Sequence, residues 1–119
     1  MKNKPTCYDL REAIPELYSG VPTFMGLPKT DSSQINEHDV IVMGAPWEGI
    51  CTTGSFTGCE LATKTIRLAS LRYGGYLPEF AYDLFDYISA ADFGDSPYFP
   101  GNSNDTFAAI ENMANEIYS

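Results

Sequence analysis

The most distinct pattern along the chain is a continuous run of apolar, mostly β-branched residues at Val40–Gly44. Polar residues precede this run and Ala45-Pro46 follows it, which is typical of a strand that is covered on both faces. A second short strand is predicted at residues 87–91, closed by a turn at residues 92–95. The sequence therefore predicts a small buried sheet.

Helical spacing of apolar residues occurs in three segments, residues 7–19, 60–72 and 103–119. For the third segment, Ser103 or Asn104 is the expected N-cap. Residues 20–36 form an irregular segment rich in turn residues, and residues 76–87 have no clear period. The apolar stripe of the second segment consists of Ala62, Ile66 and Ala69, with Leu61, Leu68 and Leu71 beside it.

The order helix, strand, helix, strand, helix predicts an α/β fold whose strands pair in parallel through right-handed crossovers. Residues 1–36 are interpreted as a helical and irregular N-terminal extension, and residues 37–119 as the first strand and helix units of the main domain. Two buried strands are far fewer than the roughly 5–6 of an average sheet. We therefore expect that another chain completes the sheet or, preferably, that these residues open a longer α/β polypeptide.

The charge of the chain excludes some classes of partner. Its 119 residues include 7 Lys and Arg against 16 Asp and Glu, which gives a net charge of −9. Such a balance repels phosphate, so we expect no nucleic-acid or membrane partner. No apolar run approaches the roughly 18 residues of a membrane span, and no signal peptide is recognisable, so a cytoplasmic protein is expected.

Cysteine and histidine usage limits the chemistry that these residues can perform alone. Three cysteines without a C-x-x-C pair are interpreted as reduced thiols, and Cys51 and Cys59 as partly buried ones. His38 is the only histidine, and its place before a strand indicates a surface or turn residue. Most self-contained hydrolytic sites are thereby excluded.

Ligands of open parallel sheets bind outside the carboxyl ends of the strands, which here are followed by loops at residues 46–58 and 92–101. In the first loop, Trp47 and Glu48 could present an aromatic face and a carboxylate to a cationic ligand. The alternative is that Trp47 packs on the sheet and Glu48 is solvated. Asp92 and Asp95 make a poor metal site without a histidine, and capping or turn formation explains them more simply. The glycines of the first loop match no phosphate-binding motif, which argues against a nucleotide-binding module.

Four motifs together resemble those of the ureohydrolase (arginase and agmatinase) family, within it the agmatinase and guanidino-acid hydrolase branch. Residues 20–28 (GVPTFMGLP) are similar to its G-[IV]-x-T-F-x-R-x-P segment, and residues 40–49 (VIVMGAPWEG) to its first strand and G-x-P-[FW]-[DE] turn. Ile66-Arg67 corresponds to the end of G-x-R-x-G-P-x-x-I-R, and residues 91–95 (ADFGD) contain D-x-G-D. Their order and spacing make the resemblance fairly specific.

The chain also departs from the family pattern. Gly26 and Glu60 replace the arginines of the first and third motifs, and Ala62-Thr63 replaces Gly-Pro, while Gly58 is retained. The metal-binding motifs G-G-D-H, D-A-H-x-D and D-x-D-x-x-D-P have no counterpart here. We therefore expect no catalytic residue and no metal ligand within residues 1–119.

The resemblance implies the N-terminal part of a three-layer arginase-like fold, assembled as trimers or hexamers. It further implies a binuclear Mn²⁺ or Ni²⁺ centre, with ligands outside these residues, that hydrolyses a guanidino compound to urea and an amine. Guanidine, a guanidino acid, agmatine and a substituted biguanide are the candidate substrates. Trp47, Glu48, Thr52 and Thr53 would form one wall of the substrate funnel.

The alternative is a catalytically inert ureohydrolase-like subunit or truncated paralogue that supports oligomer assembly, and the altered arginine and Gly-Pro positions favour it. In either case residues 1–119 alone are not expected to be catalytically active.

Overall fold

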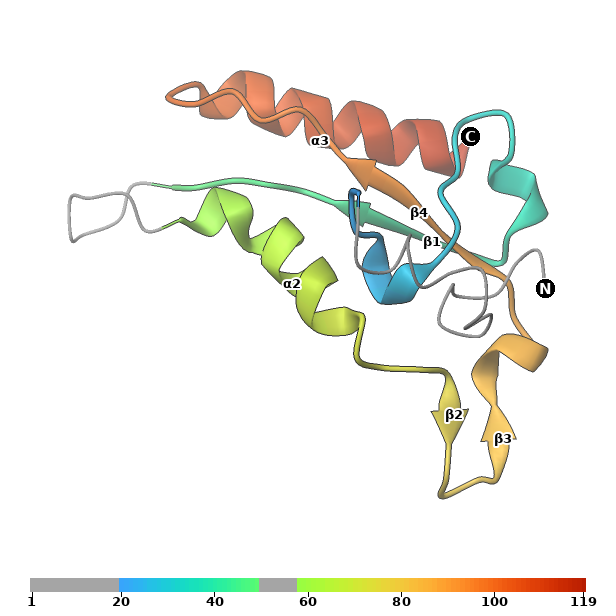
Figure 1. Cartoon of the computed structure of the whole chain (residues 1–119). Coiled ribbons are helices and arrows are strands. Elements are labelled where there is room, and N and C mark those ends of the chain that lie inside the picture. Colours follow the sequence, from blue (N-terminus) through green and yellow to red (C-terminus); the bar gives the residue numbers. More distant parts are fainter. Residues whose placement is uncertain (1–19, 50–57) are drawn as a thin grey trace.

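The computed structural model describes residues 20–49 and 58–119 of the chain (Figure 1). Strands β1 (Val40–Gly44) and β4 (Ala90–Asp95) pair in parallel, as predicted. The helix predicted at residues 7–19 lies outside the described residues.

Two helices enclose this strand pair. Helix α2 (Ala62–Ser70), preceded by a 3-10 turn at Cys59–Leu61, connects β1 to β4, and α3 (Ser103–Tyr118) follows β4. Figure 1 shows α2 below the strands and α3 above them. The layering of helix, sheet and helix confirms the predicted α/β class. Among the described residues, no helix combines the length and the apolar character needed to cross a membrane.

Strand β4 begins and ends later than predicted, at Ala90–Asp95 instead of residues 87–91. The predicted turn at residues 92–95 is therefore wrong, because Asp92 is a strand residue with hydrogen-bonded neighbours on both sides. Its N–H donates to the carbonyl of Pro28 (2.9 Å), and its carbonyl accepts from the N–H of Thr30 (3.0 Å). On its other edge β4 pairs with β1.

A bulge in β4 changes which side chains share a face. The pairing Val42↔Asp92 is followed by Met43↔Gly94, so Phe93 is the extra residue. Side chains of a regular strand alternate between faces, which would separate Asp92 from Asp95; one extra residue brings both to the same face. Gly94 has φ 91°, a left-handed conformation that glycine adopts at little cost.

Helix α2 exists where it was predicted, but its apolar stripe does not pack on the sheet. Ile66 and Leu68 are 56% and 59% exposed, whereas the polar Arg67 and Ser70 are buried. The pairing of Arg67 with β4, described below, sets this orientation.

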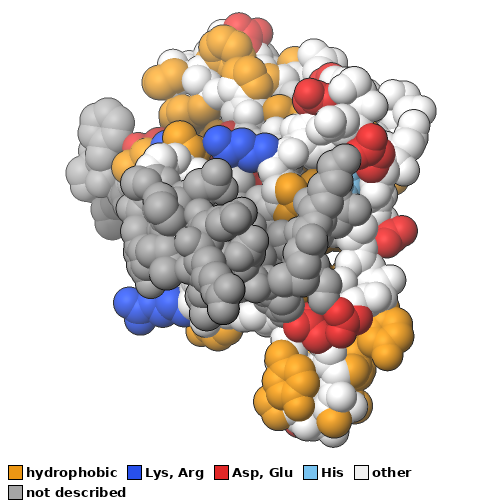
Figure 2. All heavy atoms as spheres, turned by 45° about the vertical axis from the view of Figure 1, so that its right-hand side comes forward, with side chains coloured by type: hydrophobic (Ala, Val, Ile, Leu, Met, Phe, Trp, Pro, Cys, Tyr) orange, Lys and Arg blue, Asp and Glu red, His pale blue; other side chains and the backbone are white. Residues whose placement is uncertain are grey.

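Residues 76–87, for which no period was found, contain a short antiparallel hairpin, β2 (Tyr76–Leu77) with β3 (Tyr82–Asp83). The 3-10 turn Leu84–Asp86 follows it, and its first N–H groups are capped because the Asp83 carboxylate accepts from the Phe85 N–H (2.9 Å). The hairpin projects from the rest of the described chain (Figure 1), and Figure 2 shows hydrophobic side chains around it at the bottom of the view.

The N-cap of α3 is Asn102, one residue before the nearer of the two predicted positions. Its Oδ1 accepts from the N–H of Asp105 (3.0 Å), and Asp105 lies in the first turn. The first turn is fixed further by Thr106, which is fully buried and whose hydroxyl donates to the Asn102 carbonyl (2.9 Å).

The N-terminal segment is irregular, as predicted, with 3-10 turns at Phe24–Gly26 and Ile35–Glu37. Its residues 28–30 lie along β4, with a parallel bridge between Lys29 and Asp92. In the part of the chain that the structure describes, β4 thus has neighbours on both edges, whereas β1 pairs with β4 alone.

The apolar core of the described residues is small. Leu27, Phe85, Ala90 and Ala91 are its buried members, with partly buried residues such as Val42 against them. Many large apolar side chains elsewhere stay exposed, among them those of α2 and the hairpin. Little apolar burial is therefore available to offset the entropy of ordering the chain.

For residues 1–119 as an isolated polypeptide, we expect poor solubility or a partly molten state, because the core of the described residues is small and no described strand pairs with the outer edge of β1. Scanning calorimetry should give no sharp unfolding transition, and 8-anilinonaphthalenesulfonate should bind. A cooperative transition from the purified monomer would contradict this expectation.

Candidate functional site

The carboxyl ends of β1 and β4 are joined closely. The N–H of Ser96 donates to the carbonyl of Gly44 (2.9 Å), which continues the pairing beyond the last strand residue. A Cβ on Gly44 would lie only 1.7 Å from Asp95 Oδ1, so glycine is required for the aspartate to reach over the neighbouring strand. Ligands of parallel α/β sheets bind at the carboxyl ends of the strands, and here these two strand ends are held close together.

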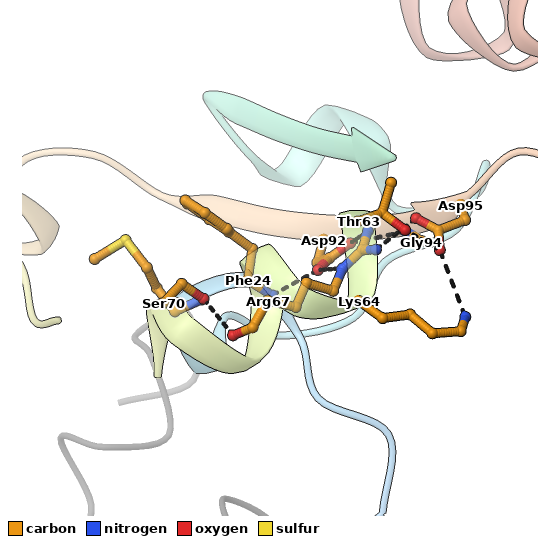
Figure 3. Close-up of polar contacts among 9 residues, drawn as sticks. Phe24, Thr63, Lys64, Arg67, Ser70, Asp92, Gly94 and Asp95 are labelled. Carbon is orange, nitrogen blue, oxygen red and sulfur yellow. Dashed lines mark hydrogen bonds and ion pairs between the residues drawn. The ribbon is translucent and has the colours of Figure 1, made fainter. Parts of the chain in front are cut away.

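Arg67 of α2 pairs with both aspartates of β4 (Figure 3). Its Nε donates to Asp92 Oδ2 (2.8 Å) and its NH2 to Asp92 Oδ1 (2.9 Å), a bidentate contact, while NH1 donates to Asp95 Oδ1 (2.5 Å). Arg67 and Asp92 are 7% and 3% exposed. Buried charges of this kind are tolerated only when they are paired and hydrogen-bonded.

The pairing outweighs the cost of burial for both charged groups. Burial alone raises the pKa of Asp92, but hydrogen bonds from Arg67 and from the N–H groups of Phe24 and Gly94 lower it below its usual value. The hydrogen bond to Asp92 raises the pKa of Arg67, against the effect of burial. Both groups are therefore ionised at neutral pH.

The same network fixes the N-terminal segment. The N–H of Phe24 donates to Asp92 Oδ2 (2.7 Å), and the N–H of Met25 donates to the hydroxyl of Ser70 (2.7 Å), which itself donates to the Arg67 carbonyl (2.6 Å). Met25 and Gly26 both have positive φ, 54° and 68°. The segment turns sharply at the point where α2 and β4 hold it.

The aspartates have a different role from the predicted one. Asp92 does accept from the Gly94 N–H (2.9 Å), as in a turn, but both of its oxygens also bind Arg67. Asp95 binds Arg67 and accepts from the Thr63 hydroxyl (2.9 Å). The described residues contain no group of three or more side chains that could hold a metal ion.

Sequence reasoning did not identify the role of Arg67, although it noted the Ile66-Arg67 motif. The available signal was a single arginine in the middle of an amphipathic helix, four residues after Thr63 and three before Ser70. Residues three and four apart share one face of a helix, so these side chains form a polar stripe. If this stripe faced the sheet, its arginine would need carboxylate partners there.

Trp47 and Glu48, the described members of the predicted substrate wall, lie three and four residues after the last residue of β1, Gly44. Trp47 is 41% exposed, and its ring lies 5.2 Å from the ring of Phe107 of α3, centroid to centroid. Glu48 is half-buried and hydrogen-bonds to Glu60, which raises the pKa of Glu60 above its usual value. The two carboxyl groups therefore face each other, with Glu60 in the turn before α2, whereas the ring of Trp47 contacts α3 on the other side of the strands.

Thr52, Thr53 and Cys51 lie outside the described residues. Cys59 is exposed, which corrects the expected partly buried thiol, because it lies in the 3-10 turn before α2, which has no buried residue. His38 is half-buried just before β1, with its Nδ1 2.8 Å from the Ser89 hydroxyl.

Comparison with known proteins adds one finding. A family model described as "Arginase family" matches residues 38–119, more than half of the chain. The match includes β1, α2, β4 and α3, and with them all three residues of the network Arg67, Asp92 and Asp95.

Replacing Arg67 with Met in the full-length protein should lower the free energy of unfolding by about 3–5 kcal/mol, because the carboxylate of Asp92 loses its partner while it stays buried. Chemical denaturation measures this change. Arg72→Met, on the same chain but at an exposed position, is the control and should change stability by less than about 0.5 kcal/mol. Equal effects of the two substitutions would show that the network does not stabilise the fold.

The lowered pKa of Asp92 predicts acid sensitivity. The ionised carboxylate stabilises the folded state above the unfolded pKa of about 3.9, and this stabilisation is lost as the pH falls through the lower, folded-state pKa. Asp92→Asn should therefore flatten the fall of Tm between about pH 5 and pH 2, where aspartates titrate. The exposed Glu79→Gln variant should keep the wild-type slope, and an unchanged slope in Asp92→Asn would refute the assignment.

Proposed function

The chain belongs to the arginase family, and on this premise we propose that it is part of a metal-dependent ureohydrolase that hydrolyses a guanidino compound to urea and an amine. The observation that carries the proposal is the family match over residues 38–119. The family is one of hydrolases. The motifs at residues 20–28 and 40–49 support the agmatinase and guanidino-acid hydrolase branch.

The groups near the end of β1 support this class of substrate. A guanidinium is a planar cation that binds carboxylates through paired hydrogen bonds and stacks on aromatic rings. Glu48 offers a carboxylate and Trp47 a partly exposed ring. Guanidine, a guanidino acid, agmatine and a substituted biguanide all present this cation, and Thr52 and Thr53 would complete the same wall.

Glu60 gives a second, electrostatic reason to expect a cationic substrate. Its carboxyl group faces Glu48, and Glu60 Oε2 is enclosed without a hydrogen-bond partner among the described residues. Two carboxylates in contact repel one another unless a proton or a cation lies between them. A bound guanidinium would supply that positive charge.

The residues described here do not fit a binuclear metal centre. Asp92 and Asp95 are committed to Arg67, and no group of three potential ligands exists among the described residues. The Mn²⁺ or Ni²⁺ ions of the proposed enzyme would therefore be held by other residues, and no chemical step is assigned to side chains of this segment.

The sheet indicates where further chain of the ureohydrolase would join. The crossover from β1 to β4 runs through α2 on one side of the sheet, while α3 leaves β4 on the opposite side (Figure 1). Such crossovers are right-handed, and α3 lies on the other side of the sheet from α2. A parallel strand after α3 would therefore be placed on the β1 side of β4, where it would pair with the open edge of β1. We propose this arrangement for the remainder of the chain, with homologous subunits forming a trimer or hexamer.

Urea release by the full-length protein, loaded with Mn²⁺ or Ni²⁺, tests the reaction. We expect urea from at least one of guanidine, agmatine, a guanidino acid and a substituted biguanide. Failure with every member of this panel, by a protein shown to be folded and metal-loaded, would contradict the proposed function.

Glu48→Gln tests the substrate wall in the same enzyme. We expect kcat/KM for the guanidino substrate to fall about tenfold, the effect of losing one charge-assisted hydrogen bond. Glu79→Gln removes an equal charge at the tip of the hairpin, where it is exposed, and should leave kcat/KM unchanged. An unchanged kcat/KM in Glu48→Gln would dismiss the role of Glu48.

A further inference from the structure

A cavity of about 490 Å³ lies between the N-terminal segment, α2 and the end of β4. Its volume is within the range of about 300–1,000 Å³ that is usual for small-molecule sites. The network of Arg67 with Asp92 and Asp95 forms part of its lining. One wall of the cavity is therefore polar, and ion pairs between its own side chains hold it in place.

The lining concentrates positive charge in an acidic chain. The described residues include only four Lys and Arg side chains, and three of them, Lys29, Lys64 and Arg67, line the cavity. They exceed the lining carboxylates, Asp92 and Asp95, by one charge, although the chain as a whole has a net charge of −9. An anion would be attracted to this part of the surface and repelled by most of the rest.

Two of the three cations are available to a ligand. All three hydrogen-bonding nitrogens of Arg67 that face β4 are occupied by aspartate oxygens. Lys64 Nζ lies 3.9 Å from Asp95 Oδ2, a long ion pair with an exposed lysine that contributes little (Figure 3). Lys29 forms no ion pair with any described residue.

Thr30, beside Lys29, supplies an unsatisfied polar group. Its Oγ1 is enclosed and makes no hydrogen bond to a described residue. Burial of a hydroxyl without a partner is unfavourable, and a ligand oxygen in the cavity would remove that cost. The pairing of residues 28–30 with Asp92 holds the hydroxyl and Lys29 in place.

Apolar side chains form the remaining walls, from Val21, Pro22, Leu68 and Phe93. We propose that the cavity binds a small carboxylate with a short apolar body, whose oxygens contact the ammonium groups of Lys29 and Lys64 and the hydroxyl of Thr30. The site does not depend on the guanidino reaction. The carboxylate is either a free organic acid or an Asp or Glu side chain of polypeptide outside the described residues.

Butyrate is the probe for the free ligand, and its neutral isostere butyramide is the control. Binding to the full-length protein is measured by ligand-observed NMR at constant ionic strength. We expect saturable binding of butyrate and none of butyramide. Lys29→Gln should weaken butyrate binding about tenfold and Thr30→Val by a smaller factor. Arg72→Gln removes the one described cation outside the cavity and should leave binding unchanged.

The outcomes separate the two sources of the carboxylate. Saturable butyrate binding that Lys29→Gln weakens and Arg72→Gln does not supports a free acid. Absence of butyrate binding, together with a lower Tm in Lys29→Gln but not in Arg72→Gln, supports a side chain of the polypeptide. The proposal is overturned if butyramide binds as well as butyrate, if both variants weaken butyrate binding equally, or if butyrate does not bind and the two variants have the same Tm. None of these readouts requires urea release.

Discussion

The neutralisation of one buried charge, the guanidinium of Arg67, determines how the described elements fit together. A buried cation without partners would be too costly to keep, so α2 must turn its polar stripe toward β4. That orientation leaves Ile66 and Leu68 exposed. Asp92, which receives the bidentate contact, also binds the N–H of Phe24, so the same interaction joins three segments that are distant in sequence.

The bulge and two glycines make this pairing possible. One extra residue in β4 places Asp92 and Asp95 on the same face, and Gly94 adopts the positive φ of the bulge. Gly44 leaves room for the carboxylate of Asp95 over the neighbouring strand. The D-x-G-D motif thus has a structural role here: it supports the edge from which Trp47 and Glu48 extend, and it forms the floor of the adjacent cavity.

Polar interactions hold the described elements together more than apolar burial does. Few apolar residues are buried in the described part of the chain, no strand described there pairs with the outer edge of β1, and α2 has an exposed apolar stripe. Both features are typical of surfaces that other parts of a protein cover. They agree with the proposal that further ureohydrolase chain packs on these residues, and they explain why the segment by itself should be marginally stable.

The sequence by itself determined the class of fold, strand β1, the positions of the two helices and the family resemblance, because these depend on local periodicity and on motifs in order along the chain. It misplaced β4, since aspartates are usual in turns and nothing local indicates that Asp92 lies between two neighbours. It also did not identify the hairpin or the pairing of Arg67. Only the tertiary structure decided which face of α2 packs inward and which carboxylates meet the guanidinium, because a buried charge is stabilised by partners that are 25 or more residues away.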